Sequence, residues 1–224
     1  MSGVQGDVPG LLMAAASLLL LAAAAGKDCW REGAKDALSS VGLSWRCRGL
    51  WGECVYDGLV GLRTCDVSPS YMETLPAALL AMRLSLLGMG SLCVSSVLVL
   101  VPALDCVRLL SSRPEGRRLL LLQVSGALCL CGGVCGAVGL LWYGVETYSR
   151  YTLEAALHTP GITFEFGASY WLLLGSEACC LTSATLTLRS WSRFREAVRT
   201  RAEPQRQPDV PAAPPPASSF QTYI

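Results

Sequence analysis

The residues most able to do covalent or metal chemistry in this chain are its eleven cysteines and its single histidine, His158. Cys54 and Cys65 lie close together, with ten residues between them. In an oxidising compartment, a pair this close forms a disulfide more often than it stays reduced. Cys29 and Cys47 precede this pair. Four cysteines allow three connectivities, so the spacing leaves open whether Cys29 and Cys47 form a second bridge.

The remaining residues give little indication of catalysis or metal binding. The sequence has no Ser–His–acid set, no phosphate-binding loop and no H-E-x-x-H motif. Cys129, Cys131 and Cys135 are neighbours, but they lie in an apolar run without a histidine or carboxylate. Small cysteines in such runs usually serve packing between helices. We therefore expect neither an enzyme nor a bound metal or other cofactor.

The elements that position these residues are four long apolar runs. The composition agrees with a membrane protein, because 52% of the 224 residues are hydrophobic and only 16% are charged. A helix needs roughly 20 apolar residues to cross a bilayer. We therefore expect four membrane spans, at about residues 8–26, 77–104, 119–142 and 167–188. The first run can also be read as a signal peptide, because residues 22–25 are small enough for a cleavage site, although no Lys or Arg precedes it.

Arginines indicate which side of the membrane each connection faces. They gather in the loop between the second and third runs and in the tail after the fourth: Arg108, Arg113, Arg117, Arg118, Arg189, Arg193, Arg195, Arg199, Arg201 and Arg206. Basic loops favour the cytoplasmic side. We therefore expect both termini in the cytoplasm and two outer loops, at 27–76 and 143–166. The first outer loop then holds the four cysteines discussed above.

Signature residues follow one another in a fixed order in the first outer loop: Trp30, then Gly49, Leu50 and Trp51, then Cys54 and Cys65. This order resembles that of the claudins of the tight junction, which carry Trp, Gly-Leu-Trp, Cys and Cys in that loop. Residues 75–79 with Arg83, and residues 165–170, are similar to the claudin entries to spans two and four. The last residues, Tyr223 and Ile224, are close to the claudin ending Tyr-Val.

The resemblance implies the fold class: a mainly α membrane protein, a left-handed bundle of four transmembrane helices with a small extracellular antiparallel β-sheet. It also implies a disulfide between Cys54 and Cys65. The dipeptide Asp57-Gly58 independently predicts a hairpin turn between these cysteines. Arg83 is expected to be a structural anchor, with its guanidinium reaching outer-loop carbonyls or water.

The resemblance further implies a component of the tight junction in the plasma membrane. Such a protein forms a paracellular barrier or an ion-selective pore by binding itself and other claudins, side by side and between cells. An alternative is an auxiliary subunit of a channel or receptor, because four-span relatives of that kind share Gly-Leu-Trp and the cysteine pair. Membrane lipid is an expected partner, whereas a net charge of +1 offers no footprint for nucleic acid.

Two acidic residues of the first outer loop are candidates for lining a pore. Asp57 and Asp66 resemble the positions at which cation-selective claudins carry acids. Rings of carboxylates at a narrow wet constriction concentrate cations and repel anions. Arginines of the same loop would favour anions if they faced the lumen, namely Arg46, Arg48 and Arg63. A third interpretation is that both acids are solvated loop residues.

Two polar features fall within the expected spans. Glu177 lies in the fourth run, where a carboxyl group needs a polar partner such as Thr182, Ser183 or Gln123. Gly132 and Gly136 have the spacing of a small-residue contact face, which serves packing within the bundle or dimerisation.

The chain divides into a four-span domain at residues 1–190 and an expected disordered cytoplasmic tail at 191–224. Residues 203–217 are rich in proline and polar residues and cannot bury a core. The final Thr222, Tyr223 and Ile224 suit strand addition to the groove of a PDZ scaffold protein, the alternative being an inert tail. Cys106, at the inner end of the second span, is a candidate for palmitoylation.

Overall fold

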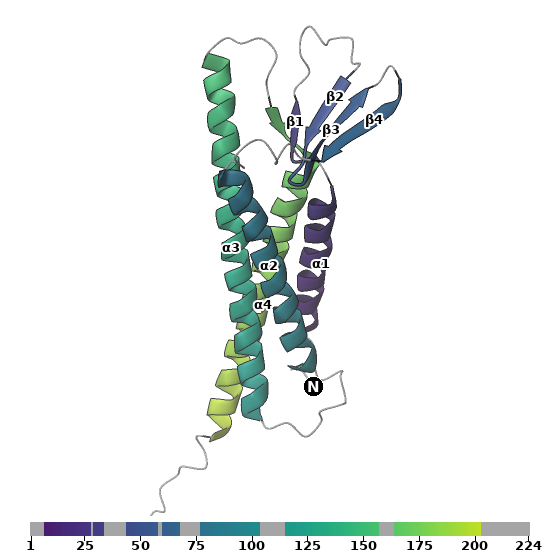
Figure 1. Cartoon of the computed structure of the whole chain (residues 1–224). Coiled ribbons are helices and arrows are strands. Elements are labelled where there is room, and N and C mark those ends of the chain that lie inside the picture. Colours follow the sequence, from purple (N-terminus) through teal and green to yellow (C-terminus); the bar gives the residue numbers. More distant parts are fainter. Residues whose placement is uncertain are drawn as a thin grey trace, which may run out of the picture.

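The computed structural model describes residues 7–27, 29–33, 44–57, 60–67, 77–103, 115–156 and 164–202. Four long helices run side by side, and a small sheet stands at one end of them (Figure 1). The first helix begins at the end of the bundle opposite to the sheet, and the fourth helix ends there. The fold class expected from the sequence, a four-helix bundle with a small antiparallel sheet, is confirmed.

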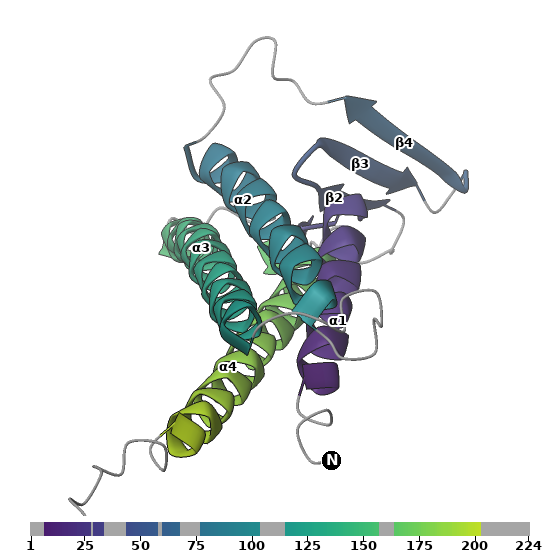
Figure 2. The ribbon, with the colours of Figure 1, turned by 90° about the horizontal axis from the view of Figure 1, so that it is seen from below.

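The helices are α1 Asp7–Gly26, α2 Ala77–Leu100, α3 Glu115–Ala156 and α4 Ala168–Ala202, and a 3-10 turn η2, Val101–Ala103, extends α2. All four are long and apolar enough to cross a membrane. They pack in the order α1, α4, α3, α2, and a smaller contact between α1 and α2 closes the bundle (Figure 2).

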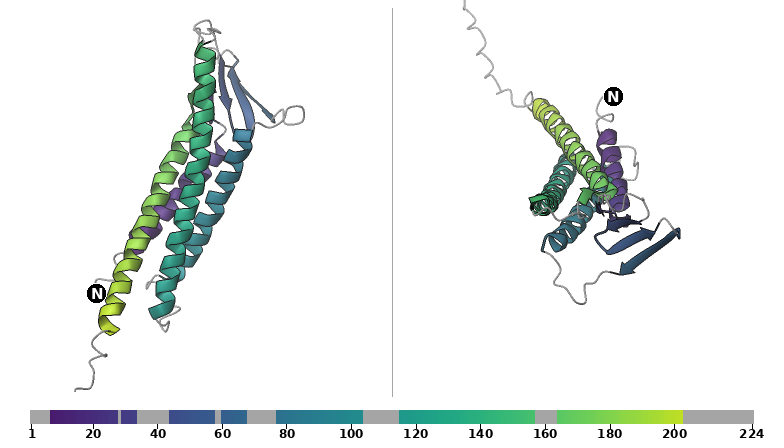
Figure 3. Two further views of the ribbon diagram at one scale, coloured as in Figure 1. Left: turned by 90° about the vertical axis from the view of Figure 1, so that its left-hand side faces the viewer. Right: turned by 90° about the horizontal axis from the view of Figure 1, so that it is seen from above.

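Two helices run further than the expected spans. The helix α3 continues to Ala156, past the expected span end at residue 142, so the first part of the expected outer loop 143–166 is helical (Figure 3). Likewise α4 continues to Ala202, so the expectation of disorder over 191–224 is wrong for residues 191–202. Contacts with α3 hold this part of α4: the Arg118 guanidinium lies 5.0 Å over the Phe194 ring, and Arg201 lies 3.5 Å from Glu115.

The sheet has five strands in the order β4-β3-β2-β1-β5, and all neighbours are antiparallel. The strands are β1 Arg31–Gly33, β2 Ser44–Arg48, β3 Gly52–Asp57, β4 Leu62–Val67 and β5 Phe164–Phe166. Because β5 directly precedes α4 and pairs with β1, it joins the second outer segment to the first.

Small residues bring the helices together. Buried hydroxyl groups form hydrogen bonds across two helix pairs. Between α2 and α3, Ser96 and Ser125 each donate to the carbonyl of the other, at 2.9 and 3.1 Å. Between α1 and α4, the Ser176 hydroxyl donates to the Ser17 carbonyl at 2.8 Å, and the Ser183 hydroxyl donates to the Gly10 carbonyl at 2.7 Å. Hydrogen bonds of this kind replace the hydrophobic effect as a source of association between helices in lipid.

Candidate functional site

The signature tryptophan Trp30 lies at the joint between the sheet and the bundle and is fully buried. Its backbone N–H donates to the Arg48 carbonyl at 2.9 Å, and its own carbonyl accepts from the Gly167 N–H at 2.9 Å. Its ring meets the Tyr143 ring edge-on, with centroids 5.9 Å apart. One residue therefore connects the first outer segment, the third helix and the entry to the fourth.

Gly167, from the expected entry motif to the fourth span, meets this joint at very close range. A Cβ atom at this position would overlap the carbonyl oxygen of Cys29 and come within 3.1 Å of the Trp30 carbonyl carbon. The close approach lets the Ser169 N–H donate to the Cys29 carbonyl at 3.1 Å. Glycine is thus required here because only a residue without a side chain leaves room for another backbone.

Gly49, Leu50 and Trp51 form the turn between β2 and β3, and Arg83 of α2 binds it. The Gly49 N–H donates to the Gly52 carbonyl at 2.8 Å, which closes the turn. Arg83 donates from Nε to the Leu50 carbonyl at 2.9 Å and also from Nη2, while its guanidinium lies 5.1 Å from the Trp51 ring centre. A carbonyl of the outer loop is the type of partner predicted for Arg83.

Two disulfides hold the sheet, one between Cys29 and Cys47 and one between Cys54 and Cys65. The strand register explains the second bond, because Cys54 of β3 lies directly opposite Cys65 of β4. Cys47 lies opposite Cys54 on the other side, so the three cysteines form one row across three strands. The structure therefore selects one of the three connectivities that the sequence allowed.

The hairpin between the bonded cysteines has a longer turn than the Asp57-Gly58 signal indicated. Strand β3 ends at Asp57 and β4 begins at Leu62. The positive φ of 65° belongs to Gly61, where glycine costs nothing, and Gly58 lies outside the described residues. Asp57 is thus the last residue of a strand rather than a position within a two-residue turn.

The strand register shows which charged residues of the sheet lie opposite one another, and so which face each pore candidate occupies. Glu53 lies opposite Arg48 on one side and opposite Asp66 on the other. Arg48 and Glu53 form an ion pair at 3.3 Å. Asp57 lies four residues after Glu53 on the same strand, and side chains two or four residues apart share one face of a strand. Sequence reasoning missed Glu53 as a third acid of this group.

The three competing arginines do not share one face of the sheet. Arg63 lies opposite Tyr56, one position out of phase with Asp57, and its Nη2 lies 3.7 Å from the Cys54 sulfur. It therefore occupies the cysteine face. Arg48 occupies the same face as Glu53, while the backbone of Arg46 lies opposite Val55 on β3. By register, the positions of Arg46 and Arg48 therefore fall on the acidic face, where Arg48 is paired with Glu53.

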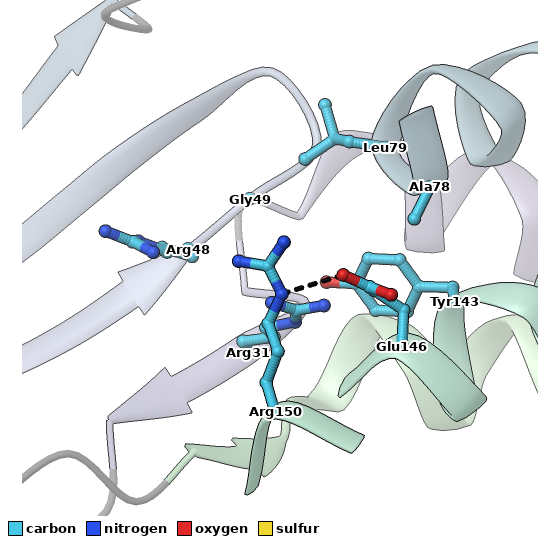
Figure 4. A pocket seen from close by; sticks show the side chains of 8 residues that line it. All are labelled: Arg31, Arg48, Gly49, Ala78, Leu79, Tyr143, Glu146 and Arg150. Carbon is cyan, nitrogen blue, oxygen red and sulfur yellow. Dashed lines mark hydrogen bonds and ion pairs between the residues drawn. The ribbon is translucent and has the colours of Figure 1, made fainter. Parts of the chain in front are cut away.

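A cavity of about 90 Å³ opens where the sheet meets the helices (Figure 4). It is lined by Arg31, Arg48, Gly49, Ala78, Leu79, Tyr143, Glu146 and Arg150. Arg150 donates from Nε to the Glu146 carboxylate at 2.8 Å, and the Arg31 guanidinium lies 4.8 Å from the Tyr143 ring centre. The cavity therefore combines several guanidinium groups with an aromatic wall.

Glu177 is buried in the bundle, and among the described residues neither carboxyl oxygen has a hydrogen-bond partner. Two of the three expected partners bond elsewhere: Thr182 donates to the Ala178 carbonyl at 2.7 Å, and Ser183 donates to the Gly10 carbonyl. The carboxyl instead faces Gly133 and Gly136 of α3, where an added Cβ would meet its oxygens. Gly136 and Gly132 also meet α2, so this glycine pair serves packing within the bundle.

The three buried thiols that meet in the bundle are Cys93, Cys129 and Cys180, one from each of three helices. Cys131 and Cys135, which are the neighbours of Cys129 in the sequence, do not belong to this cluster. The Cys180 sulfur lies 3.2 Å from Cys93 and 3.5 Å from Cys129. Two sulfurs bound tetrahedrally to one zinc ion at about 2.3 Å would lie roughly 3.8 Å apart. These spacings are therefore those of packed thiols rather than of a preformed metal site.

Four further candidates lie outside the described residues: Cys106, Thr222, Tyr223 and Ile224. Palmitoylation of Cys106 and binding of the chain end to a PDZ scaffold remain predictions from the sequence.

Comparisons with known proteins agree on one family. The model of the PMP-22/EMP/MP20/Claudin family matches residues 8–186. Human Claudin-16 is 38% identical over 162 residues, which cover 71% of this chain and 67% of the human protein. Rat Claudin-16 is 36% identical over 163 residues, with the same two shares. Rat Claudin-18 is 26% identical over 200 residues, 81% of this chain and 74% of the rat protein.

Proposed function

Because the chain belongs to the PMP-22/EMP/MP20/Claudin family, and is a claudin-like multi-pass membrane protein of tight junctions, we propose that it builds a paracellular barrier or an ion-selective pore. It does so by associating with copies of itself and with other claudins, within one membrane and between cells. Its action is structural, through contacts between subunits, and needs no catalytic group.

The observation that carries this proposal is the edge of the outer sheet. Strand β4 ends the strand order, so within the described sheet one side of β4 has no neighbouring strand. An unpaired strand edge presents N–H and C=O groups that pair readily with another chain. Val60 and Leu62, at the start of this edge, are 74% and 60% exposed. An exposed apolar edge of this kind favours lateral association.

The charges on the acidic face support a cation-selective pore over an anion-selective one. Glu53 and Asp57 share that face, and Asp66 lies opposite Glu53 in the register. Of the competing arginines, Arg48 is paired with Glu53 and Arg63 lies on the cysteine face, so the three acidic positions of this face outnumber its two arginine positions, 46 and 48. If subunits pair so that this face lines a gap between cells, its carboxylates attract cations.

The arginine-rich ends of α3 and α4 favour an orientation with both chain termini in the cytoplasm. The sheet then stands outside the cell, where its two disulfides are stable. The four-span domain covers residues 1–190, and α4 continues into the cytoplasm before the tail. The tail beyond residue 202 tethers Thr222, Tyr223 and Ile224, which recruit a PDZ scaffold. The bilayer itself is the remaining partner, with Cys106 as a lipid attachment site.

Freeze-fracture of cells that lack other claudins and express this chain alone tests the proposal. Wild type should form continuous intramembrane strands at cell contacts. Leu62→Lys places a charge on the sheet edge and should abolish or fragment the strands while the protein still reaches the surface. Leu153→Lys is the matched control, since Leu153 is also exposed, at 61%, but lies on α3 away from the sheet edge.

Two outcomes would contradict the proposal. One is wild type that reaches the surface without forming strands and instead co-purifies in fixed ratio with a channel or receptor, which would identify an auxiliary subunit. The other is strands that form equally well in wild type and in Leu62→Lys, which would move the lateral contact away from β4.

A further inference from the structure

The cavity at the joint of sheet and bundle holds more guanidinium groups than carboxylates. Arg31, Arg48 and Arg150 line it, and Glu146 is the one acidic residue of the lining. Arg150 pairs with Glu146, and Arg48 pairs with Glu53 outside the lining. Among the described residues, Arg31 has no carboxylate partner. The cavity therefore keeps a positive charge after its ion pairs are counted.

Arg31 carries a second sign of an incomplete site. Its Nε atom is buried and, among the described residues, has no hydrogen-bond acceptor. A buried donor without an acceptor is costly, and the cost is larger for a charged group. The rest of the guanidinium lies against the Tyr143 ring, which attracts the cation but accepts no hydrogen bond at Nε. An oxygen-rich anion in the cavity would satisfy this donor.

Figure 4 shows how the cationic side chains are arranged. The ends of Arg31 and Arg150 lie next to the Tyr143 ring and the Glu146 carboxylate, whereas Arg48 extends along the sheet. Two guanidinium groups thus lie near each other, and the Glu146 carboxylate pairs with only one of them, that of Arg150. The planar donor fork of arginine fits the oxygens of carboxylate and phosphate groups with two hydrogen bonds at once. An anion in the cavity would offer acceptors to both forks.

The position of the cavity indicates where that anion comes from. Ala78 and Leu79 of the lining belong to the first turn of α2, where that helix enters the membrane. Trp142 and Trp171, at the same end of the bundle, are 53% and 58% exposed. Exposed tryptophans gather at the level of lipid headgroups. The cavity therefore opens close to the layer in which the phosphates of phospholipids lie.

We propose that this cavity binds a phosphate group, supplied by the headgroup of a phospholipid in the leaflet next to the sheet, with Arg31 and Arg150 as its main donors. The bound phosphate joins β1 to α3 and so fixes the sheet on the bundle. This site is independent of whether the protein seals or conducts. Free phosphate offers the same oxygens, and the experiment separates the two sources.

The test uses the full chain, purified in a mild detergent and depleted of lipid. Thermal unfolding is followed by tryptophan fluorescence in the presence of dioctanoyl phosphatidylcholine, dioctanoyl glycerol, which lacks the phosphate, or inorganic phosphate. Native mass spectrometry counts the phospholipid molecules that stay bound. The variants are Arg31→Gln and Arg150→Gln, with Arg63→Gln as control, because Arg63 is an exposed arginine of the same sheet outside the cavity.

Phosphatidylcholine should raise the unfolding temperature of wild type and of Arg63→Gln, and dioctanoyl glycerol should not. Arg150→Gln should weaken the apparent affinity about tenfold, as expected for the loss of one charge-assisted contact. Arg150 is the safer variant, since its side chain is half-exposed on a helix surface, whereas Arg31→Gln tests the buried donor. Protection by inorganic phosphate alone would support the phosphate site and assign it to a soluble anion.

Equal protection by dioctanoyl glycerol and phosphatidylcholine would overturn the proposal, because the phosphate would then contribute nothing. So would unchanged lipid affinity in both Arg31→Gln and Arg150→Gln. If lipid and phosphate had no effect on wild type but Arg150→Gln altered its oligomeric state, the arginines would serve a contact between copies of the chain, and the phosphate site would be rejected.

Discussion

The outer sheet and the helix bundle are held together by different physics. In the sheet, two disulfides, backbone ladders and ion pairs such as Arg48–Glu53 provide the order. In the bundle, order comes from glycines, packed thiols and reciprocal serine hydrogen bonds. Water competes for every polar group of a five-stranded sheet, so covalent bonds are needed there. Lipid competes for none, so small residues that allow close backbone approach are enough.

The largest effect is expected when a disulfide of the sheet is removed. The double variant Cys54→Ser with Cys65→Ser should cost about 2–5 kcal/mol of sheet stability, because losing a native disulfide frees the unfolded segment. We expect reduced delivery to the cell surface. The control is Cys131→Ser, which replaces an exposed cysteine outside the disulfides and should behave as wild type. Non-reducing peptide mapping that finds Cys54 and Cys65 as free thiols in wild type would contradict it.

The next test breaks the link between the two regions. Arg83→Ala removes the donors to the Leu50 carbonyl and should cost about 1.5–3 kcal/mol, the usual contribution of hydrogen bonds from a charged group. Arg83→Lys keeps the charge and should recover part of the stability. The measurement is thermal unfolding of purified protein together with surface delivery. If Arg83→Ala folded and trafficked normally but changed ion conduction, Arg83 would be a gating residue rather than an anchor.

A third test adds a side chain where α3 packs closely against its neighbouring helices. Gly136→Val adds a side chain where a Cβ atom already meets the Glu177 carboxyl and the Met89 sulfur, so it should cost about 1–3 kcal/mol by overpacking. Gly116→Val is the control, since nothing lies within 4 Å of a Cβ atom added at Gly116. Thermal unfolding in detergent measures both. A loss as large in the control would place the effect on helix propensity instead of packing.

A smaller effect is expected for one hydrogen bond between helices. Ser96→Ala removes a buried donor to α3 and should cost about 0.6 kcal/mol, the average measured for such bonds in a membrane protein. Ser95→Ala, whose hydroxyl is exposed and bonds only within α2, should cost less. Added reducing agent should leave the difference between the two variants unchanged, because no disulfide lies in the bundle as described.

The last test concerns charge and should leave stability almost unchanged. Asp57→Asn and Glu53→Gln should each lower the sodium-to-chloride permeability ratio of epithelial layers that express the chain, as measured by dilution potentials. Asp57→Glu, which keeps the charge, is the control. A wild type that prefers chloride would instead indicate that arginines line the conducting path.

The sequence predicted the architecture well because four apolar runs and one ordered set of outer residues determine it. It identified the Cys54–Cys65 pair and an outer-loop carbonyl as the kind of partner that Arg83 binds, whereas the anchor role of Arg83 stays a prediction. It could not choose a partner for Cys29 or bring Cys93, Cys129 and Cys180 together. Such contacts depend on how helices rotate against one another, and this rotation leaves no mark on spacing along the chain.

Helix ends were the other limit. Hydropathy ends a span where the apolar run ends, but a backbone helix continues as long as side chains cover it and no proline interrupts it. The Arg118 guanidinium of α3 lies over the Phe194 ring of α4. This contact covers part of the segment up to Ala202, whose composition indicated a tail but which is helical.

The length of α3 gives the protein a mechanical property. Its 42 residues form a single rod of about 63 Å at a rise of 1.5 Å per residue. One end carries Glu115, paired with Arg201, and the other end carries Arg150 beside the outer cavity. Because the helix is continuous, a tilt at one of its ends also moves the other, so the cavity and the Glu115–Arg201 pair are joined by one rigid element.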